Sequence, residues 1–171
     1  MSSHELERFI STWDREAQGA LKVLRALPAN QYDFRPDAGG RSLGELGWHL
    51  AEVDSYITWG IERGGLDQPG RPPGIERPRS VAELAPGFDR IHSDSVARVR
   101  KLKPEDLDRK IAFFDGREMR VGDMLWGALL HHLIHHRGQL TLMNRLAGGK
   151  SPGLYGPTRE DMAAMQAKAK A

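Results

Sequence analysis

The chain has 171 residues, of which 39% are hydrophobic, and this composition predicts one compact domain spanning residues 1–171. It contains no cysteine, which excludes a disulfide scaffold, a thiolate metal site and a cysteine nucleophile. Its 25 basic and 23 acidic side chains give a formal charge of +2 without a basic stripe, so we expect it to bind neither nucleic acid nor membranes.

The N-terminal segment MSSHELERF lacks the basic region and apolar run of a secretory signal peptide. The absence of cysteine fits a reducing compartment. No stretch of the sequence approaches the roughly 20 apolar residues of a membrane span. We therefore predict a cytoplasmic protein.

The first predicted helix covers residues 3–27 and ends before Pro28, because its apolar side chains recur at steps of three and four. These side chains are Phe9, Ile10, Trp13, Ala17, Ala20, Leu21 and Leu24. Residues 33–41 are rich in turn formers and predict a loop. The second helix starts at Ser42, which forms a capping box with Glu45, and it runs to Arg63 before two glycines.

The middle of the chain is less regular. Residues 66–79, rich in proline, glycine and arginine, predict an irregular connection. Ser80 and Glu83 form the pattern of a second capping box, for a helix that ends near Leu102. The Pro86–Gly87 pair predicts either a kink or a short helix before a longer one. Further along, Asp115–Gly116 predicts a hairpin with a two-residue turn.

The last long helix is predicted from Val121 to Leu146, where two glycines follow. Thr158 and Asp161 can then cap a short C-terminal helix. The predicted fold class is therefore all-α: a four-helix bundle with a short β-hairpin before the last long helix and a short C-terminal helix.

Four of the seven histidines lie in the segment HHLIHHRGQ, residues 131–139. At about 100° per residue, His132 and His136 share one stripe of the last helix, one turn apart, so both rings can bind one ion. The other members of this stripe are Val121, Leu125, Ala128, Gln139, Met143 and Leu146. His131 and His135 form a competing pair at the same spacing, and His135 alone can still reach the site.

A third ligand is predicted on the second helix, where His49 lies on a mostly apolar face with Leu46, Val53 and Tyr56. Three histidines leave coordination positions open, as in catalytic sites. For such ligands we favour Zn or Ni, with Fe, Co, Cu or Mn as alternatives. The two remaining histidines, His4 and His92, stand among polar residues, and we expect both at the surface.

A general base is not supplied by the metalloprotease pattern H-E-x-x-H, because Leu133 follows His132. Glu45 and Glu52 flank His49 by about one helical turn. Glu45 already serves the capping box, so Glu52 is the preferred candidate for a catalytic base or for a hydrogen-bond partner of a ligand histidine.

Other polar residues near the histidines have two interpretations each. Arg137 is either an anion clamp for substrate or, as we prefer, part of a salt bridge or dimer contact. Gln139 follows His136 on the stripe and can hydrogen-bond within the core. Tyr155 either closes over the pocket or belongs to a structural turn. Three tryptophans are expected to pack between helices or to line the pocket: Trp48, Trp59 and Trp126.

Three segments together resemble the DinB family, also called DinB/YfiT-like proteins: GELGWHLAEVDSYI, LLHHLIHHRGQLTLMNRLAG and LYGPT. The resemblance implies a four-helix bundle that binds a metal through one histidine of the second helix and two of the last. These positions correspond to His49, His132 and His136. It also implies a homodimer and, within the wider superfamily, transfer or isomerisation with low-molecular-weight thiols. The chain departs from the family at Pro86–Gly87 and in its proline-rich connection.

The predicted function is that of a metal-dependent enzyme with a small-molecule substrate, either a hydrolase or a transferase that uses a thiol cosubstrate. Three neutral nitrogen ligands leave the charge of the ion uncompensated, which favours an anionic ligand at the open position. The alternatives are a non-catalytic bundle that binds a metal or small ligand, and a dimeric scaffold with vestigial histidines.

Overall fold

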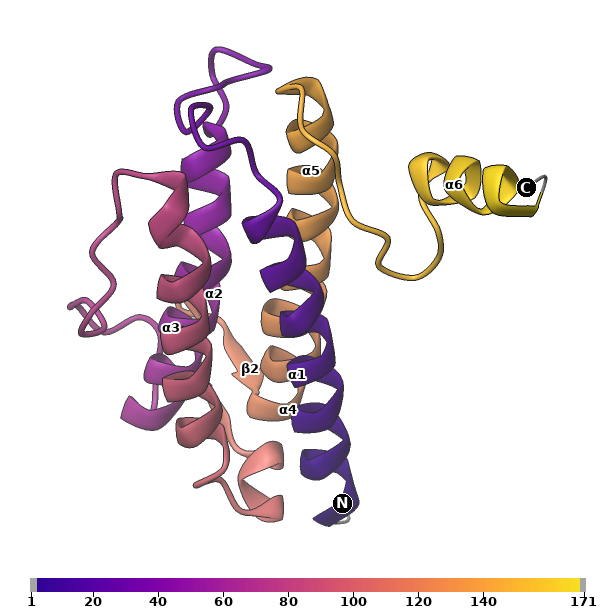
Figure 1. Cartoon of the computed structure of the whole chain (residues 1–171). Helices are drawn as coiled ribbons and strands as arrows, with labels where there is room; N and C mark the ends of the chain where they lie inside the picture. The colour runs from indigo at the N-terminus through magenta and orange to yellow at the C-terminus, as the bar shows by residue number, and fades with distance from the viewer. Residues whose placement is uncertain (1–2, 170–171) are drawn as a thin grey trace.

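The computed structural model describes residues 3–169, and within them the chain is a helical bundle with one small hairpin (Figure 1). The bundle contains α1 (Ser3–Arg25), α2 (Leu43–Arg63), α3 (Leu84–Val99) and a final helical rod, residues 121–146, which ends in α5 (His132–Leu146). Helices α1 and α2 each pack against α3 and α5. The predicted fold class is confirmed. None of the described helices combines the length and the apolar character that crossing a membrane would require.

The second helix begins where the sequence predicts. Glu45 N donates to Ser42 Oγ (3.2 Å), and Ser42 N donates to Glu45 Oε2 (2.8 Å), so the capping box is complete. Gly64 ends α2 in the left-handed conformation, at a φ of 86°. Both ends of the helix that carries His49 are therefore determined by local hydrogen bonds.

The start of the third helix differs from the prediction. A 3₁₀ turn, η1 (Val81–Glu83), precedes α3, which begins at Leu84 and includes Pro86 and Gly87. The short turn before a longer helix is present, but the prediction that Pro86–Gly87 separates the two is wrong, because Pro86 lies in the first turn of α3, where its missing N–H costs no helical hydrogen bond. The predicted capping box is wrong: Ser80 Oγ donates to the Glu83 carboxylate (2.5 Å), while the Glu83 N–H bonds to the Ser80 carbonyl (3.4 Å). The 3₁₀ bond uses the N–H that the serine side chain would have capped. Helix α3 ends at Val99, earlier than the predicted Leu102.

The hairpin consists of β1 (Lys110–Ala112) and β2 (Glu118–Arg120), which pair antiparallel after a 3₁₀ turn, η2 (Pro104–Asp108). The last hydrogen bond before the turn joins Phe113 N to the Arg117 carbonyl (2.8 Å). This bond leaves residues 114–116 in the turn, one more than the two residues predicted. Gly116, at a φ of 79°, occupies the left-handed position of this turn. A bond from Leu66 N to the Ala112 carbonyl (2.8 Å) ties the hairpin to the chain after α2.

The final rod is not a uniform α-helix. It starts as α4 (Val121–Asp123), continues as a π-helical segment, η3 (Met124–His131), and becomes α5 at His132. A π-turn holds more residues than an α-turn, so it changes the helix phase before the histidines. The buried stripe of α5 consists of Leu133, Arg137, Leu140, Met143 and Asn144. The predicted stripe is thus partly wrong: His132 and His136 flank the buried stripe, while Gln139 and Leu146 are exposed.

The connection over residues 66–79 is irregular, as predicted, and it packs against the bundle. Trp48 Nε1 donates to the Ile75 carbonyl (3.2 Å), and the Tyr32 hydroxyl donates to the Pro78 carbonyl (2.6 Å). Trp48 itself fits between α2 and α3 because Gly87 has no side chain: a Cβ there would lie 2.6 Å from the indole. The last helix, α6 (Arg159–Ala169), stands apart from the bundle in Figure 1.

Candidate metal centre

Three histidines from two neighbouring helices converge on one point. His49 projects from α2, and His132 and His136 project from α5. One nitrogen from each ring lies within 4.8 Å of the other two. The ring centroid of His49 lies 5.5 Å from that of His132 and 4.8 Å from that of His136. Among residues 3–169, this is the group of side chains with the spacing to hold a metal ion.

The Nδ1 atoms of two of these rings are engaged by neighbouring oxygens. Glu52 Oε2 lies 3.0 Å from His49 Nδ1, and Gln139 Oε1 lies 2.7 Å from His136 Nδ1. Both oxygens can accept an Nδ1–H, which leaves the Nε2 lone pairs free to bind an ion. Each acceptor is three residues from its histidine, so one helical turn supplies both the ligand and the group that orients it.

The residues present fit a cation. The Nε2 atoms of His132 and His136 are 2.6 Å apart, so their two lone pairs repel unless a proton or a cation lies between them. Burial lowers the pKa of His136 to about 4. Burial, together with the neighbouring His49, His135 and Arg41, also lowers the pKa of His132. Both rings are therefore neutral near pH 7, which is the state that binds metals.

Glu52 is held by two partners. Its Oε2 contacts His49, and its Oε1 accepts a hydrogen bond from Arg77 Nη2 at 3.0 Å. Burial raises the pKa of Glu52, but the hydrogen bonds from His49 and Arg77 outweigh it and lower the pKa overall. A carboxylate with both oxygens engaged and a lowered pKa is a weak base. The geometry therefore favours Glu52 as the residue that orients His49.

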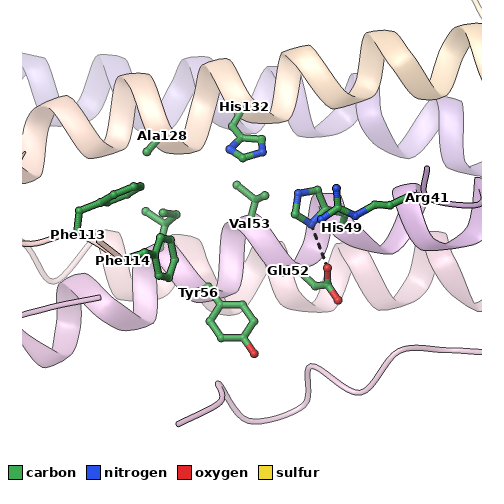
Figure 2. A pocket seen from close by; sticks show the side chains of 10 residues that line it. Arg41, His49, Glu52, Val53, Tyr56, Phe113, Phe114, Ala128 and His132 are labelled. Atoms are coloured by element: carbon green, nitrogen blue, oxygen red, sulfur yellow. Dashed lines mark hydrogen bonds and ion pairs between the residues drawn. The ribbon is translucent and has the colours of Figure 1, made fainter. Parts of the chain in front are cut away.

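A cavity of about 450 Å³ opens beside the histidines, between α2, the final rod and the hairpin (Figure 2). Arg41, His49 and Glu52 form its polar end. Its other walls are largely apolar and include Val53, Tyr56, Ile57, Phe113, Phe114 and Ala128. His132 faces the same cavity from the opposite helix. A ligand in the cavity would thus contact two of the three histidines.

The competing histidine pair does not come together with His49. His131 and His135 are both exposed. The His135 ring lies 4.9 Å from the His136 ring, yet it does not belong to the group of three. His4, expected at the surface, is exposed.

The expectation that His92 lies at the surface is wrong, because this residue is only 6% exposed. Its Nδ1 lies 2.7 Å from Asp54 Oδ2, and its Nε2 lies 3.0 Å from Asp14 Oδ1. His92 thus links α3 to α2 and α1. The polar residues beside it in the sequence do not reveal these two carboxylates, which lie 38 and 78 residues away.

Arg137 and Tyr155 do not line the cavity beside the histidines. The Arg137 side chain is 2% exposed and forms an ion pair with Glu16 Oε2 at 2.7 Å. Its Nη1 also donates to the Glu16 carbonyl (2.7 Å). The Tyr155 hydroxyl contacts Arg137 and donates to Glu16 Oε2 (2.5 Å). The salt-bridge interpretation of Arg137 agrees with this structure. Tyr155 links the C-terminal segment to the ion pair of Arg137 and Glu16.

The three tryptophans named from the sequence also lie outside the cavity. Trp48 is buried between helices. Trp126 packs edge-on against Phe9, with ring centroids 5.4 Å apart. Trp59 lies beneath the Arg63 guanidinium at 4.0 Å. The aromatic wall comes instead from Phe113 and Phe114, which sequence reasoning did not select because only the packing of the hairpin brings them to α2.

The chain is similar to known proteins over most of its length. Residues 12–140 match the model of the DinB superfamily. The uncharacterised protein YrdA of Bacillus subtilis strain 168 is 31% identical over 163 residues, covering 92% of both chains. A crystal structure of a DinB-like protein from Bacillus cereus ATCC 10987 is 28% identical, with a TM-score of 0.74, covering 87% of this chain and 97% of that one.

A second crystal structure, of the DinB-like protein YjoA from Bacillus subtilis, has a TM-score of 0.71 at 21% identity. It covers 88% of this chain and 98% of that one, and it supports the fold alone. The family model over residues 12–140 and the DinB-like structure at 28% identity lead to the same assignment. This chain belongs to the DinB superfamily.

Proposed function

We propose that the chain is a metal-dependent enzyme whose ligands are His49, His132 and His136, and that it acts as a hydrolase or as a transferase using a low-molecular-weight thiol. The observation that carries the proposal is the convergence of three imidazoles within 4.8 Å beside a cavity of about 450 Å³. A site with three protein ligands and an adjacent cavity leaves room for substrate, which is typical of catalytic centres.

The side chains around the histidines would prepare the site for a divalent ion. Glu52 and Gln139 hold the Nδ1 atoms of His49 and His136 and so orient their Nε2 atoms toward a common point. A bound divalent ion would supply Lewis acidity and lower the pKa of a water or thiol. We favour Zn or Ni, with Fe, Co, Cu or Mn as alternatives. The apolar walls of the cavity would keep bulk water away from the reacting groups.

Turnover by the metal-loaded protein tests this proposal. The chain is stripped with a chelator and reloaded with Zn²⁺ or Ni²⁺, and two reactions are followed: hydrolysis of p-nitrophenyl esters, and displacement of chloride from 1-chloro-2,4-dinitrobenzene by the thiol of cysteine or glutathione. We expect turnover in the loaded wild type and its loss in His132→Ala, while the exposed His135→Ala variant on the same helix remains active. Metal retention without turnover in either reaction would favour the non-catalytic binding module instead.

We also propose a homodimer, and α6 supplies a physical reason. None of its described residues is buried, and Met162 and Met165 are exposed. The described part of α6 is linked to the bundle through Glu160, which pairs with Arg145 of α5 (3.0 Å), but it buries no side chain. A helix of 11 residues that buries no apolar face is marginal in water, so contact with a second copy would stabilise it. Sedimentation of the full chain should show a dimer that Met162→Glu/Met165→Glu weakens. A monomer at all concentrations would contradict this part of the proposal.

A further inference from the structure

Arg41 is a cation at the candidate centre that forms no ion pair with any of residues 3–169. It immediately precedes Ser42, the N-cap of α2, and its side chain lines the polar end of the cavity that His49 also lines (Figure 2). It lines the cavity of about 450 Å³ and also a second one of about 440 Å³, which contains His136. Arg41 therefore stands between the two cavities that flank the histidines.

Two carboxylates that follow Arg41 on α2 already have cationic partners. Glu45 pairs with Arg35 (2.8 Å), and Glu52 pairs with Arg77 (3.0 Å). Asp37 lines the second cavity with Arg41, but within residues 3–169 no carboxylate reaches ion-pair distance of the Arg41 guanidinium. An arginine held at a cavity wall without a counter-ion provides planar donors for an anion.

The far end of the first cavity has the opposite character. Tyr56 of α2 and Phe113 and Phe114 of the hairpin turn form an apolar wall (Figure 2). Phe114 is 54% exposed, so its ring has apolar surface left to cover. The cavity is thus polarised along its length, with a cation and the histidines at one end and aromatic rings at the other. An elongated ligand with one anionic end and one apolar end matches both.

We propose that the substrate of this site is an amphipathic carboxylate, whose carboxylate binds Arg41 and whose apolar or aromatic portion packs against Phe113 and Phe114. One guanidinium suits a monoanionic carboxylate better than a dianionic phosphate, which usually takes several cationic or backbone donors. The orientation would place the atoms next to the carboxylate beside His49 and His132. This inference rests on the proposed function for its chemistry, but the anion contact itself requires no metal.

Binding of 4-phenylbutyrate tests the inference, with the uncharged 4-phenylbutyramide as the matched ligand. Titration calorimetry uses chelator-treated full-length protein, so that no metal can bind the carboxylate. We expect tighter binding of the acid, and Arg41→Gln should weaken it about tenfold, the lower end for a charge-assisted pair at an exposed position. The same variant should leave the affinity for the amide unchanged. Phe114→Ala should weaken both ligands.

Arg71→Gln is the matched control, because Arg71 is an exposed arginine that does not line either cavity. Equal affinities for acid and amide, or an acid affinity that Arg41→Gln leaves unchanged, would overturn the inference. Metal content measured on the same preparations separates it from the proposed function. A wild type that cannot retain metal but prefers the acid would refute the metal-dependent enzyme and support the anion site. A metal-binding wild type without this preference would overturn the anion site and leave the three-histidine metal site standing.

Discussion

Replacing Arg137 with methionine would leave the Glu16 carboxylate buried without its cationic partner. The Glu16 side chain is 8% exposed, and Arg137 contributes both the ion pair and a hydrogen bond to the Glu16 carbonyl. Removing one member of a buried ion pair costs about 3–5 kcal/mol of unfolding free energy. For a chain of 171 residues this corresponds to a decrease in Tm of roughly 6–20 °C.

The pH dependence of this loss follows from Glu16. Burial raises the pKa of its carboxyl, but Tyr155 and Arg137 outweigh burial and hold the pKa below 4.5. In the wild type the ionised pair therefore stabilises the fold above pH 4.5, and this contribution is lost as the pH falls through the lowered pKa. In Arg137→Met the carboxylate is left without its cation, so the difference between the two proteins should be largest near pH 7 and shrink toward pH 4.

Urea unfolding followed by circular dichroism measures the difference at both pH values. Arg159→Met is the control, because Arg159 is 84% exposed and its ion pair with Glu160 should contribute less than about 1 kcal/mol. A loss below about 1 kcal/mol for Arg137→Met at pH 7 would refute the reasoning. An equal loss at pH 4 and pH 7 would show that packing, and not charge, explains the effect.

Three further predictions concern other contacts. Gly19→Ala should destabilise the fold despite the better helix propensity of alanine, since its Cβ would lie 2.6 Å from Arg137 Nη1, and thermal unfolding measures the result. Glu52→Gln should weaken Zn²⁺ binding about 10–100-fold in a competitive chelator titration, because the amide orients His49 less strongly; an unchanged affinity would argue against this role. Burial lowers the pKa of His92, but hydrogen bonds and charge interactions with two flanking carboxylates outweigh burial and raise the pKa overall. Protonated His92 therefore stabilises the fold below pH 6.5, and this contribution is lost as the pH rises through the raised pKa. Unfolding of wild type and His92→Asn between pH 6 and pH 9 should therefore converge with rising pH.

Local patterns predicted the helices that carry the histidines. The capping box at Ser42 and Glu45 forms because both partners lie within one turn and the helix starts there. The same pattern at Ser80 and Glu83 did not form, because a 3₁₀ turn uses the Glu83 N–H. Which face of the last helix is buried could not be predicted either, because its π-helical segment has no local sequence signal. The π-helical segment shifts the buried stripe of α5 so that it includes Arg137.

Long-range pairings account for most of what sequence reasoning missed at the site. The partner of Arg137 lies 121 residues away, and the hairpin that supplies Phe113 reaches the cavity only through tertiary packing. Arg41 was not selected because, in the sequence, it resembles any loop arginine. Its role depends on nearby carboxylates having other partners, which only the structure shows.

Metal content of the purified chain tests the central claim most directly. Protein expressed without a tag is dialysed against Zn²⁺ and then metal-free buffer, and the metal-to-protein ratio is measured by mass spectrometry for wild type, His49→Ala, His132→Ala, His136→Ala and His135→Ala. We predict a ratio near one for wild type and for His135→Ala, and a marked loss in each of the other three. Full retention by His132→Ala, or a loss confined to His135→Ala, would contradict a site formed by His49, His132 and His136.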